Sequence, residues 1–142
     1  MITGELPPID DMEALGIPVP DFFTRFIERF GEDAAVDFCL KHGGARIDTL
    51  GMTRALSRRF GSEVAAWIHQ TYHGHRFYAP MWLKSAWVIR RYHIRRLIRD
   101  GHKDAVICDR LQCHPRTVTR QRAYMRERHL VNYSQAEDGA AR

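Results

Sequence analysis

A stretch of the sequence repeats itself at an offset of 30 residues. Six pairs of positions are identical at this offset: Arg29/Arg59, Phe30/Phe60, Gly31/Gly61, Ala35/Ala65, Gly44/Gly74 and Arg46/Arg76. The alternative is a chance likeness between two amphipathic helix pairs, and the number of identities at one offset favours repetition. Two copies of one supersecondary unit indicate an internal duplication, or a unit that pairs with itself.

Each copy is predicted to form a helix, a break, a second helix and a short strand. In the first copy, apolar residues recur at helical spacing as far as Gly31, which ends the first helix. The second helix ends at Gly43, and residues 45–50 alternate loosely, as a strand does. The second copy ends in an extended stretch over residues 75–79. We therefore expect a mainly α fold, with a possible two-stranded sheet and possible dimerisation in the duplicated domain of residues 20–82.

Both ends of the chain are predicted to be flexible. Residues 1–19 are acidic and contain three prolines, which is typical of a loosely ordered arm, and residues 132–142 form a polar, Ala/Gly-rich tail. The start of the chain lacks the basic and apolar stretches of a signal peptide. Apolar runs are too short to cross a bilayer, and three cysteines imply no disulfide framework. We expect a cytoplasmic protein, bacterial or phage-encoded, with no membrane contact.

Positive charge is concentrated in residues 84–128. This segment has 13 Lys and Arg residues against 4 Asp and Glu, whereas residues 1–50 have 4 against 10. Binding of a polyanion is the first physical interpretation of such a block. A solvated basic surface is the alternative, and charge alone does not separate the two.

Residues 83–131 are predicted to form three helices that make a helix-turn-helix domain. The second helix begins near Asp104, which suits an N-cap, and ends near Leu111. The third begins at Pro115, since proline is favoured at the first helical position, and extends to about Arg128. This third helix is the expected recognition helix.

The spacing of small and apolar residues fits the packing of a helix-turn-helix. Cys108 supplies the small residue where the third helix crosses the second, and Ile107 and Leu111 seal that contact. Cys113 is expected to be buried in the turn, and Val118 to point inward from the recognition helix. The alternative is a plain three-helix bundle with a basic face. Spacing, turn chemistry and charge agree, which favours binding of double-stranded DNA.

The outward residues of this domain are the predicted DNA contacts. The candidates for reading bases are Arg116, Thr117, Thr119 and Arg120. Arginine can bond a guanine edge with two donors, and threonine can donate, accept or touch a thymine methyl. The candidates for contacting phosphate, which position a protein without specifying sequence, are Arg91, Arg95, Arg99, Lys103, His114, Gln121, Arg122 and Arg126. Arg122 fits poorly, because many such motifs have an aliphatic residue there. Either the helix is slightly rotated or the arginine stem packs while its head reaches solvent.

No catalytic constellation, cofactor or metal site is predicted. His69 and His73 share a helical face, a spacing that zinc can use, but no Cys or carboxylate completes the set convincingly. Cys108, Cys113 and His114 are a second conceivable set, yet the helix-turn-helix already uses both cysteines as small buried residues. No phosphate-binding glycine loop follows a strand, and no nucleophile elbow is present. We expect a protein that is not an enzyme.

These features resemble the Mor/C family of phage middle and late transcription activators. Members join a helical unit to a Gly-Gly-x-x-Ile-Tyr-Ile-Pro-like strand, followed by a helix-turn-helix. Residues 73–80, His-Gly-His-Arg-Phe-Tyr-Ala-Pro, resemble that strand, and residues 43–47 keep its Gly-Gly part but lack the Tyr and Pro. The resemblance covers about residues 20–128. It implies a homodimer that binds a two-fold-related promoter site and contacts RNA polymerase.

The duplication departs from this family pattern, because two copies could form a pseudo-dimer within one chain. The sequence as a whole predicts a sequence-specific, double-stranded-DNA-binding transcription regulator of phage or mobile-element type, acting as a dimer. The alternative is a non-catalytic DNA-targeting or protein-interaction accessory module in recombination or phage–host conflict.

Overall fold

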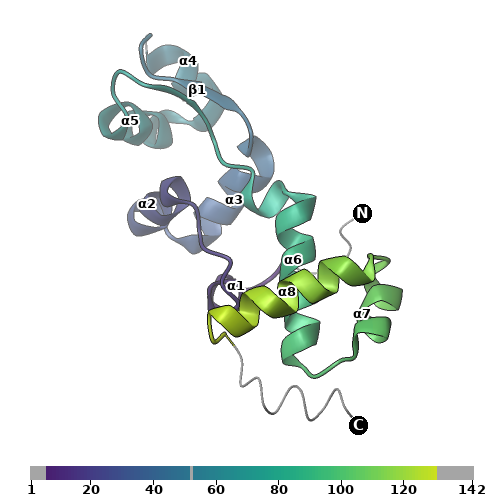
Figure 1. Ribbon diagram of the computed structural model, residues 1–142. Helices are drawn as coiled ribbons and strands as arrows, with labels where there is room; N and C mark the ends of the chain where they lie inside the picture. Colours follow the sequence, from purple (N-terminus) through teal and green to yellow (C-terminus); the bar gives the residue numbers. More distant parts are fainter. Residues whose placement is uncertain (1–5, 52, 131–142) are drawn as a thin grey trace. The chain divides into compact units, whose positions relative to one another are not determined.

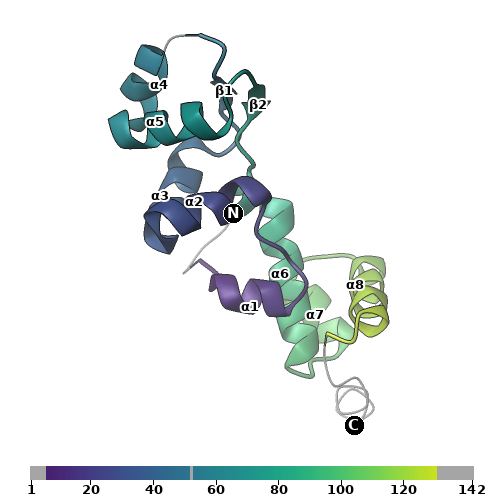
Figure 2. The same ribbon diagram turned by 90° about the vertical axis from the view of Figure 1, so that its left-hand side faces the viewer.

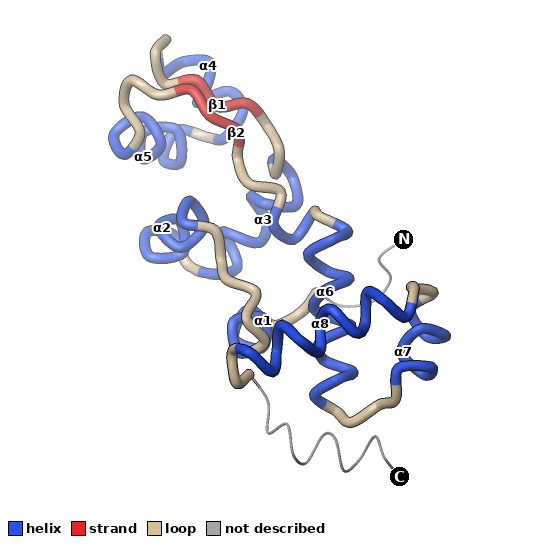
Figure 3. Tube along the Cα trace, viewed as in Figure 1, coloured by secondary structure: helices blue, strands red, loops and turns tan. Residues whose placement is uncertain are grey.

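The computed structural model describes residues 6–51 and 53–130, which belong to two compact units. Of the described residues, 21–51 and 53–81 belong to one unit, and 6–20 and 82–130 belong to the other. The described part is mainly helical, with a two-stranded antiparallel sheet, as predicted (Figure 1 and Figure 3). Within it, no helix has the length and apolar character needed to cross a membrane. The predicted tail of residues 132–142 lies outside the described residues.

The unit of residues 21–81 contains both copies of the repeat, and the copies have the same elements. The first copy forms α2 (Asp21–Phe30), α3 (Glu32–His42) and β1 (Arg46–Asp48). The second copy forms α4 (Thr53–Phe60), α5 (Ser62–Thr71) and β2 (Arg76–Tyr78). The glycines between the helices have nearly the same backbone, with φ 94° and ψ 165° at Gly31 and φ 87° and ψ 159° at Gly61. Glycine alone adopts this region readily, which explains why it repeats.

The strand register relates the two copies by a two-fold rotation. β1 and β2 are antiparallel, and Ile47 lies opposite Phe77. These two residues are 30 positions apart, the offset of the repeat, so the axis passes between them. Two flanking backbone hydrogen bonds exchange under this rotation, from Thr49 N–H to the His75 carbonyl (3.0 Å) and from Ala79 N–H to the Ala45 carbonyl (2.8 Å). The sheet is therefore built by the two copies pairing within one chain.

Aromatic side chains from both copies form one core in this unit. The ring of Phe38 on α3 lies 5.2 Å from that of Phe60 on α4, and the ring of Trp67 on α5 lies 5.4 Å from that of Phe26 on α2, between centroids. Each contact joins the second helix of one copy to the first helix of the other. Because each copy buries its apolar side against the other, we expect the two to fold together.

The other unit contains the three predicted helices. A 3-10 turn, η1 (Trp82–Lys84), precedes α6 (Ala86–Arg99), and α7 (Asp104–Leu111) and α8 (Pro115–Glu127) follow. These three helices contact one another pairwise (Figure 2). One detail of the prediction is wrong: Lys103, not Asp104, is the N-cap of α7. Asp104 is the first residue of that helix, and its carboxylate accepts a hydrogen bond from Arg122 instead.

The predicted flexible arm of residues 1–19 is wrong for the described part of that segment. Ile9–Ala14 form a helix, α1, within the helix-turn-helix unit. Met12, Leu15 and Ile17 are each at most 2% exposed. The segment is ordered because these apolar residues are buried and because its polar groups have partners on α6 and α8, described below. Because the segment is rich in acids and prolines, its composition predicted an arm and not this short amphipathic helix.

Candidate nucleic-acid interface

Two buried residues fix which side of α8 is exposed. Val118 on α8 and Ile107 on α7 have no exposed surface, as predicted for the packing of a helix-turn-helix. With Val118 turned inward, three of the predicted base-reading side chains are exposed, those of Arg116, Thr119 and Arg120, and Thr117 is half-buried. The candidate interface is therefore the first two turns of α8.

The start of α8 is held by its own polar groups. The Nδ1 atom of His114 accepts a hydrogen bond from the backbone N–H of Arg116 at 3.0 Å, so His114 caps the helix. The other ring nitrogen of this exposed histidine remains a donor for phosphate, the role predicted from sequence. The Thr119 hydroxyl donates to the Pro115 carbonyl at 3.1 Å and keeps its capacity to accept.

Two predicted phosphate contacts are buried, and the prediction is wrong for both. Arg95 is 1% exposed and Gln121 is 9% exposed. Arg95 Nε donates to Gln121 Oε1 at 2.7 Å, and Nη1 donates to the Leu15 carbonyl at 2.8 Å. The guanidinium also stacks on Tyr124, with Cζ 3.9 Å from the ring centroid. Burial lowers the pKa of Arg95, and Tyr124 opposes that shift. Arg95 thus joins α6, α8 and the N-terminal segment and cannot reach DNA.

Arg122 also has a structural role. Its Nε donates to the Asp104 carboxylate and its Nη2 donates to the His102 carbonyl at 2.7 Å, and the side chain is 15% exposed. These bonds join α8 to the first residue of α7 and to the loop that precedes it. An arginine therefore replaces the expected aliphatic residue by bridging two helices through its head group, which neither sequence-based alternative described.

The other predicted phosphate contacts differ in exposure. Lys103 and Arg126 are exposed. Arg91 is half-buried, with Cζ 5.9 Å from the centroid of the Trp87 ring. Arg99 is exposed in part, but it is paired within its own unit by Asp11. Lys103 has no carboxylate partner among the described residues.

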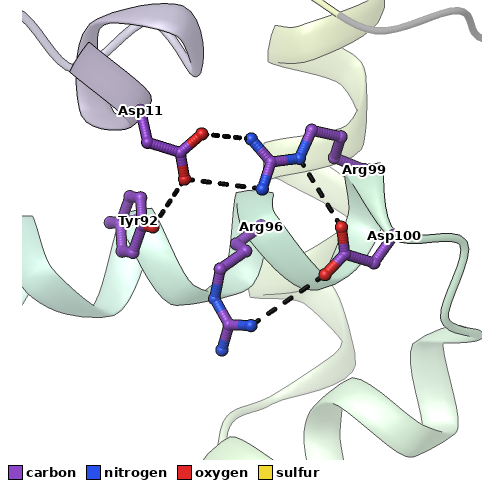
Figure 4. A network of polar contacts seen from close by, with 5 residues as sticks. All are labelled: Asp11, Tyr92, Arg96, Arg99 and Asp100. Atoms are coloured by element: carbon purple, nitrogen blue, oxygen red, sulfur yellow. Dashed lines mark hydrogen bonds and ion pairs between the residues drawn. The ribbon is translucent and has the colours of Figure 1, made fainter. Parts of the chain in front are cut away.

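Asp11 of α1 anchors the N-terminal segment to α6 (Figure 4). Its carboxylate accepts hydrogen bonds from the Arg99 guanidinium and, at 2.6 Å, from the Tyr92 hydroxyl. Arg99 Nε also lies 3.6 Å from the Asp100 carboxylate, so two acids share this arginine. The bonds from Arg99 and Tyr92 lower the pKa of Asp11, while burial and the bond to Asp11 raise the pKa of Tyr92 to about 12. Because residues 1–19 were predicted to be flexible, Asp11 was not predicted as a partner of Arg99 and Tyr92.

In the variant Asp11→Asn, the free energy of unfolding should depend less on pH in the acid range. Because the pKa of Asp11 is lowered on folding, its contacts stabilise the protein above the ordinary value of 3.8 and are lost as pH falls below it. Partial exposure limits the effect to about 1 kcal/mol. Urea unfolding at neutral and at acidic pH measures it, with Asp10→Asn, an exposed neighbour, as the control. Equal stability of the two variants at neutral pH would contradict the prediction.

Five exposed cations of this unit have no carboxylate partner among the described residues, and we call them the unpaired cations. They are Arg90, Lys103, Arg110, Arg116 and Arg120. Arg116 and Arg120 lie one helical turn apart on α8. Arg90 is close enough to the turn before α8 for its charge to act on the Cys113 thiol. Arg90 and Arg110 were not among the predicted contacts, because only the packing shows which arginines of a basic segment lack partners.

The residue types that can ligate a metal do not form a cluster in the described part of the chain. Across residues 6–51 and 53–130, no group of three or more such side chains is placed to hold an ion. The rings of His69 and His73 lie 4.9 Å apart between centroids. Cys108 and Cys113 are both half-buried, so Cys113 is more accessible than predicted.

Comparisons with protein-family models, with curated proteins and with solved structures found no match for this chain. The resemblance to the Mor/C family therefore stays a prediction, and the function has to be inferred from the site.

Proposed function

We propose that this chain is a sequence-specific DNA-binding regulator of transcription, of phage or mobile-element type, that acts in the cytoplasm. One observation carries the proposal. The burial of Val118 and Ile107 turns Arg116 and Arg120 outward on α8, one turn apart, and neither has an acidic partner in the described part of the chain. The packing of a helical bundle does not require two neighbouring exposed arginines that both lack an acidic partner.

The dimensions of α8 suit the major groove of DNA. An α-helix with its side chains is roughly 10–12 Å across, and the groove is about 12 Å wide. In a helix-turn-helix the N-terminal residues of the second helix reach base edges while the first helix crosses the backbone. Arg116, Thr117, Thr119 and Arg120 occupy those N-terminal positions on α8. Lys103, at the start of α7, is placed to meet phosphate.

Measuring the mass of the protein in solution tests whether it is a monomer or a dimer. A homodimer and a contact with RNA polymerase are implied by the Mor/C resemblance alone. The pairing of β1 with β2 inside one chain supports the competing pseudo-dimer, because the sheet needs no strand from a second molecule. We expect a monomer when mass is measured by light scattering in solution. A stable dimer would favour the family architecture instead.

Affinity for double-stranded DNA should fall steeply as salt rises. Each neutralised phosphate contributes about −0.9 to the slope of log affinity against log salt. Three phosphate contacts, from the unpaired cations not assigned to bases (Arg90, Lys103 and Arg110), would give a slope of about −3. Fluorescence anisotropy with a labelled duplex measures it, and Lys103→Ala should make the slope shallower by about 1. A flat dependence, or no binding at low salt, would overturn the proposal and favour a protein-interaction module with an acidic partner.

A further inference from the structure

The end of α7 brings two cysteines together. Gln112 has the left-handed backbone, with φ 51° and ψ 51°, and the backbone N–H of Cys113 donates to the carbonyl of Cys108 at 3.2 Å. This bond, from the residue after the left-handed position back to the residue five before it, is the outer bond of a Schellman motif. In that motif the side chains of the two bonded residues commonly touch. Here both of them are thiols.

The backbone hydrogen bond keeps the two cysteines close in space. With the hydrogen bond at 3.2 Å, standard bond lengths keep the Cα atoms of Cys108 and Cys113 within about 7 Å of each other. Disulfides join Cα atoms roughly 4.4–6.8 Å apart. Burial raises the pKa of the Cys113 thiol, and the neighbouring Cys108 side chain raises it further, so the two thiols are close enough to influence each other. Both side chains are half-buried, so a small reagent can reach them.

Other uses of this pair are less well supported. A metal would need a further ligand, but His114 Nδ1 is engaged in capping α8 and no third ligand is placed nearby in the described residues. The remaining cysteine, Cys39, belongs to the other unit, is fully buried, and donates from Sγ to the Met81 carbonyl at 3.3 Å. Cys108 and Cys113 are therefore a separate pair with one obvious chemistry.

We propose that Cys108 and Cys113 form a reversible intramolecular disulfide at the turn of the helix-turn-helix, with a small-molecule disulfide such as oxidised glutathione as the oxidant. The thiolate of one cysteine attacks a sulfur of the oxidant, forms a mixed disulfide and expels one glutathione thiolate. The thiolate of the second attacks the protein sulfur of that mixed disulfide and expels the other glutathione. Two protein thiols are oxidised, one disulfide is reduced, and the thiol protons pass to the released glutathione. This modification site does not depend on the proposed DNA binding.

Peptide mapping of the full-length protein tests the proposal. Trypsin cleaves after Lys103, Arg110 and Arg116, so Cys108 and Cys113 fall in separate peptides, residues 104–110 and 111–116. The protein is incubated with oxidised glutathione at mildly alkaline pH, because the raised pKa of Cys113 leaves its thiol protonated at neutral pH. It is then denatured, alkylated and digested. We expect these two peptides to be joined, Cys39 to be alkylated, and excess reduced thiol to reverse the link.

Single cysteine-to-serine variants test which two cysteines form the disulfide. Cys39→Ser should retain the link between the two peptides, whereas Cys108→Ser and Cys113→Ser should abolish it and leave the remaining thiol as a glutathione adduct. Retention of a stable glutathione adduct on the unsubstituted protein would overturn the proposal. So would a link between two chains, or between Cys39 and either cysteine of the pair. Because the unsubstituted protein gives the decisive peptide pair, the result does not rest on the folding of any variant.

Discussion

The substitution Arg95→Met should lower the free energy of unfolding by about 3 kcal/mol. Arg95 is buried, and its guanidinium donates to the side chain of Gln121 and to the backbone carbonyl of Leu15. Hydrogen bonds from a charged group are worth about 1.5–3 kcal/mol each, and a buried acceptor left without a donor adds to the loss. Methionine keeps the apolar stem, so the variant isolates the polar head and its stacking on Tyr124.

Two further variants make this measurement specific. Arg90→Met removes an exposed arginine of the same helix and should change stability by no more than about 0.5 kcal/mol. Gln121→Leu leaves Arg95 Nε without its acceptor, so it should also destabilise the protein. The double variant removes both partners and should lose about 1–2 kcal/mol less than the sum of the single losses. Urea unfolding followed by circular dichroism gives these values.

Hydrogen exchange shows where the stability is lost. Arg95 is one of the links between α6 and the N-terminal segment, so the amides of α1 should lose protection in Arg95→Met before those of α3 or α5 do. A loss of stability no greater than that of Arg90→Met would mean that the buried contacts of Arg95 contribute little. The N-terminal segment would then be held mainly by its apolar residues and by the hydrogen bonds of Asp11 with Tyr92 and Arg99.

The helices of the helix-turn-helix were predicted well because their signals are local. Pro115 marks the start of α8, and the spacing of Ile107 and Val118 is set by two helices joined through a tight turn. Each of these features acts over a few residues. The two-stranded sheet was also predicted, since each copy of the repeat ends in a short extended stretch. The sequence left open whether the two copies pair with each other, and their spacing did not predict the register, in which Ile47 lies opposite Phe77.

The two largest errors, the flexible arm and the exposed Arg95, have a common cause, which is contact over long sequence separation. Leu15 and Arg95 are 80 residues apart, and Asp11 and Tyr92 are 81 apart. Arginine is rarely buried, so its regular spacing on α6 predicted an exposed basic stripe. Arg95 instead lies against a segment that composition alone made a flexible arm. Local pattern cannot show that a distant carbonyl will satisfy a buried guanidinium.

The substitutions Arg116→Ala and Arg120→Ala should each weaken binding to the preferred DNA site by about 1–3 kcal/mol and change binding to random duplex much less. Both side chains are exposed near the start of α8, where a recognition helix meets base edges. The preferred site is first selected from a random duplex library with the unsubstituted protein. Affinities for that site and for a scrambled duplex are then measured by anisotropy at one fixed salt concentration, because phosphate contacts depend on salt.

Charge-preserving and matched variants separate the two possible roles of these arginines. Arg116→Lys keeps the charge but loses the planar pair of donors, so it should retain binding to scrambled DNA while losing most of the preference for the selected site. Arg110→Ala removes an exposed, unpaired cation of α7 and should weaken both duplexes to a similar extent. The comparison is between a residue that reads bases and one that contacts phosphate within the same small unit.

The pattern of losses decides how α8 is used. Equal losses on both duplexes would make Arg116 and Arg120 phosphate contacts, and specificity would have to come from Thr117 and Thr119 or from the shape of the DNA. No loss on either duplex would show that α8 does not meet DNA at all. We would then infer that these two exposed arginines bind an acidic protein surface, and the proposed DNA-binding function would be wrong.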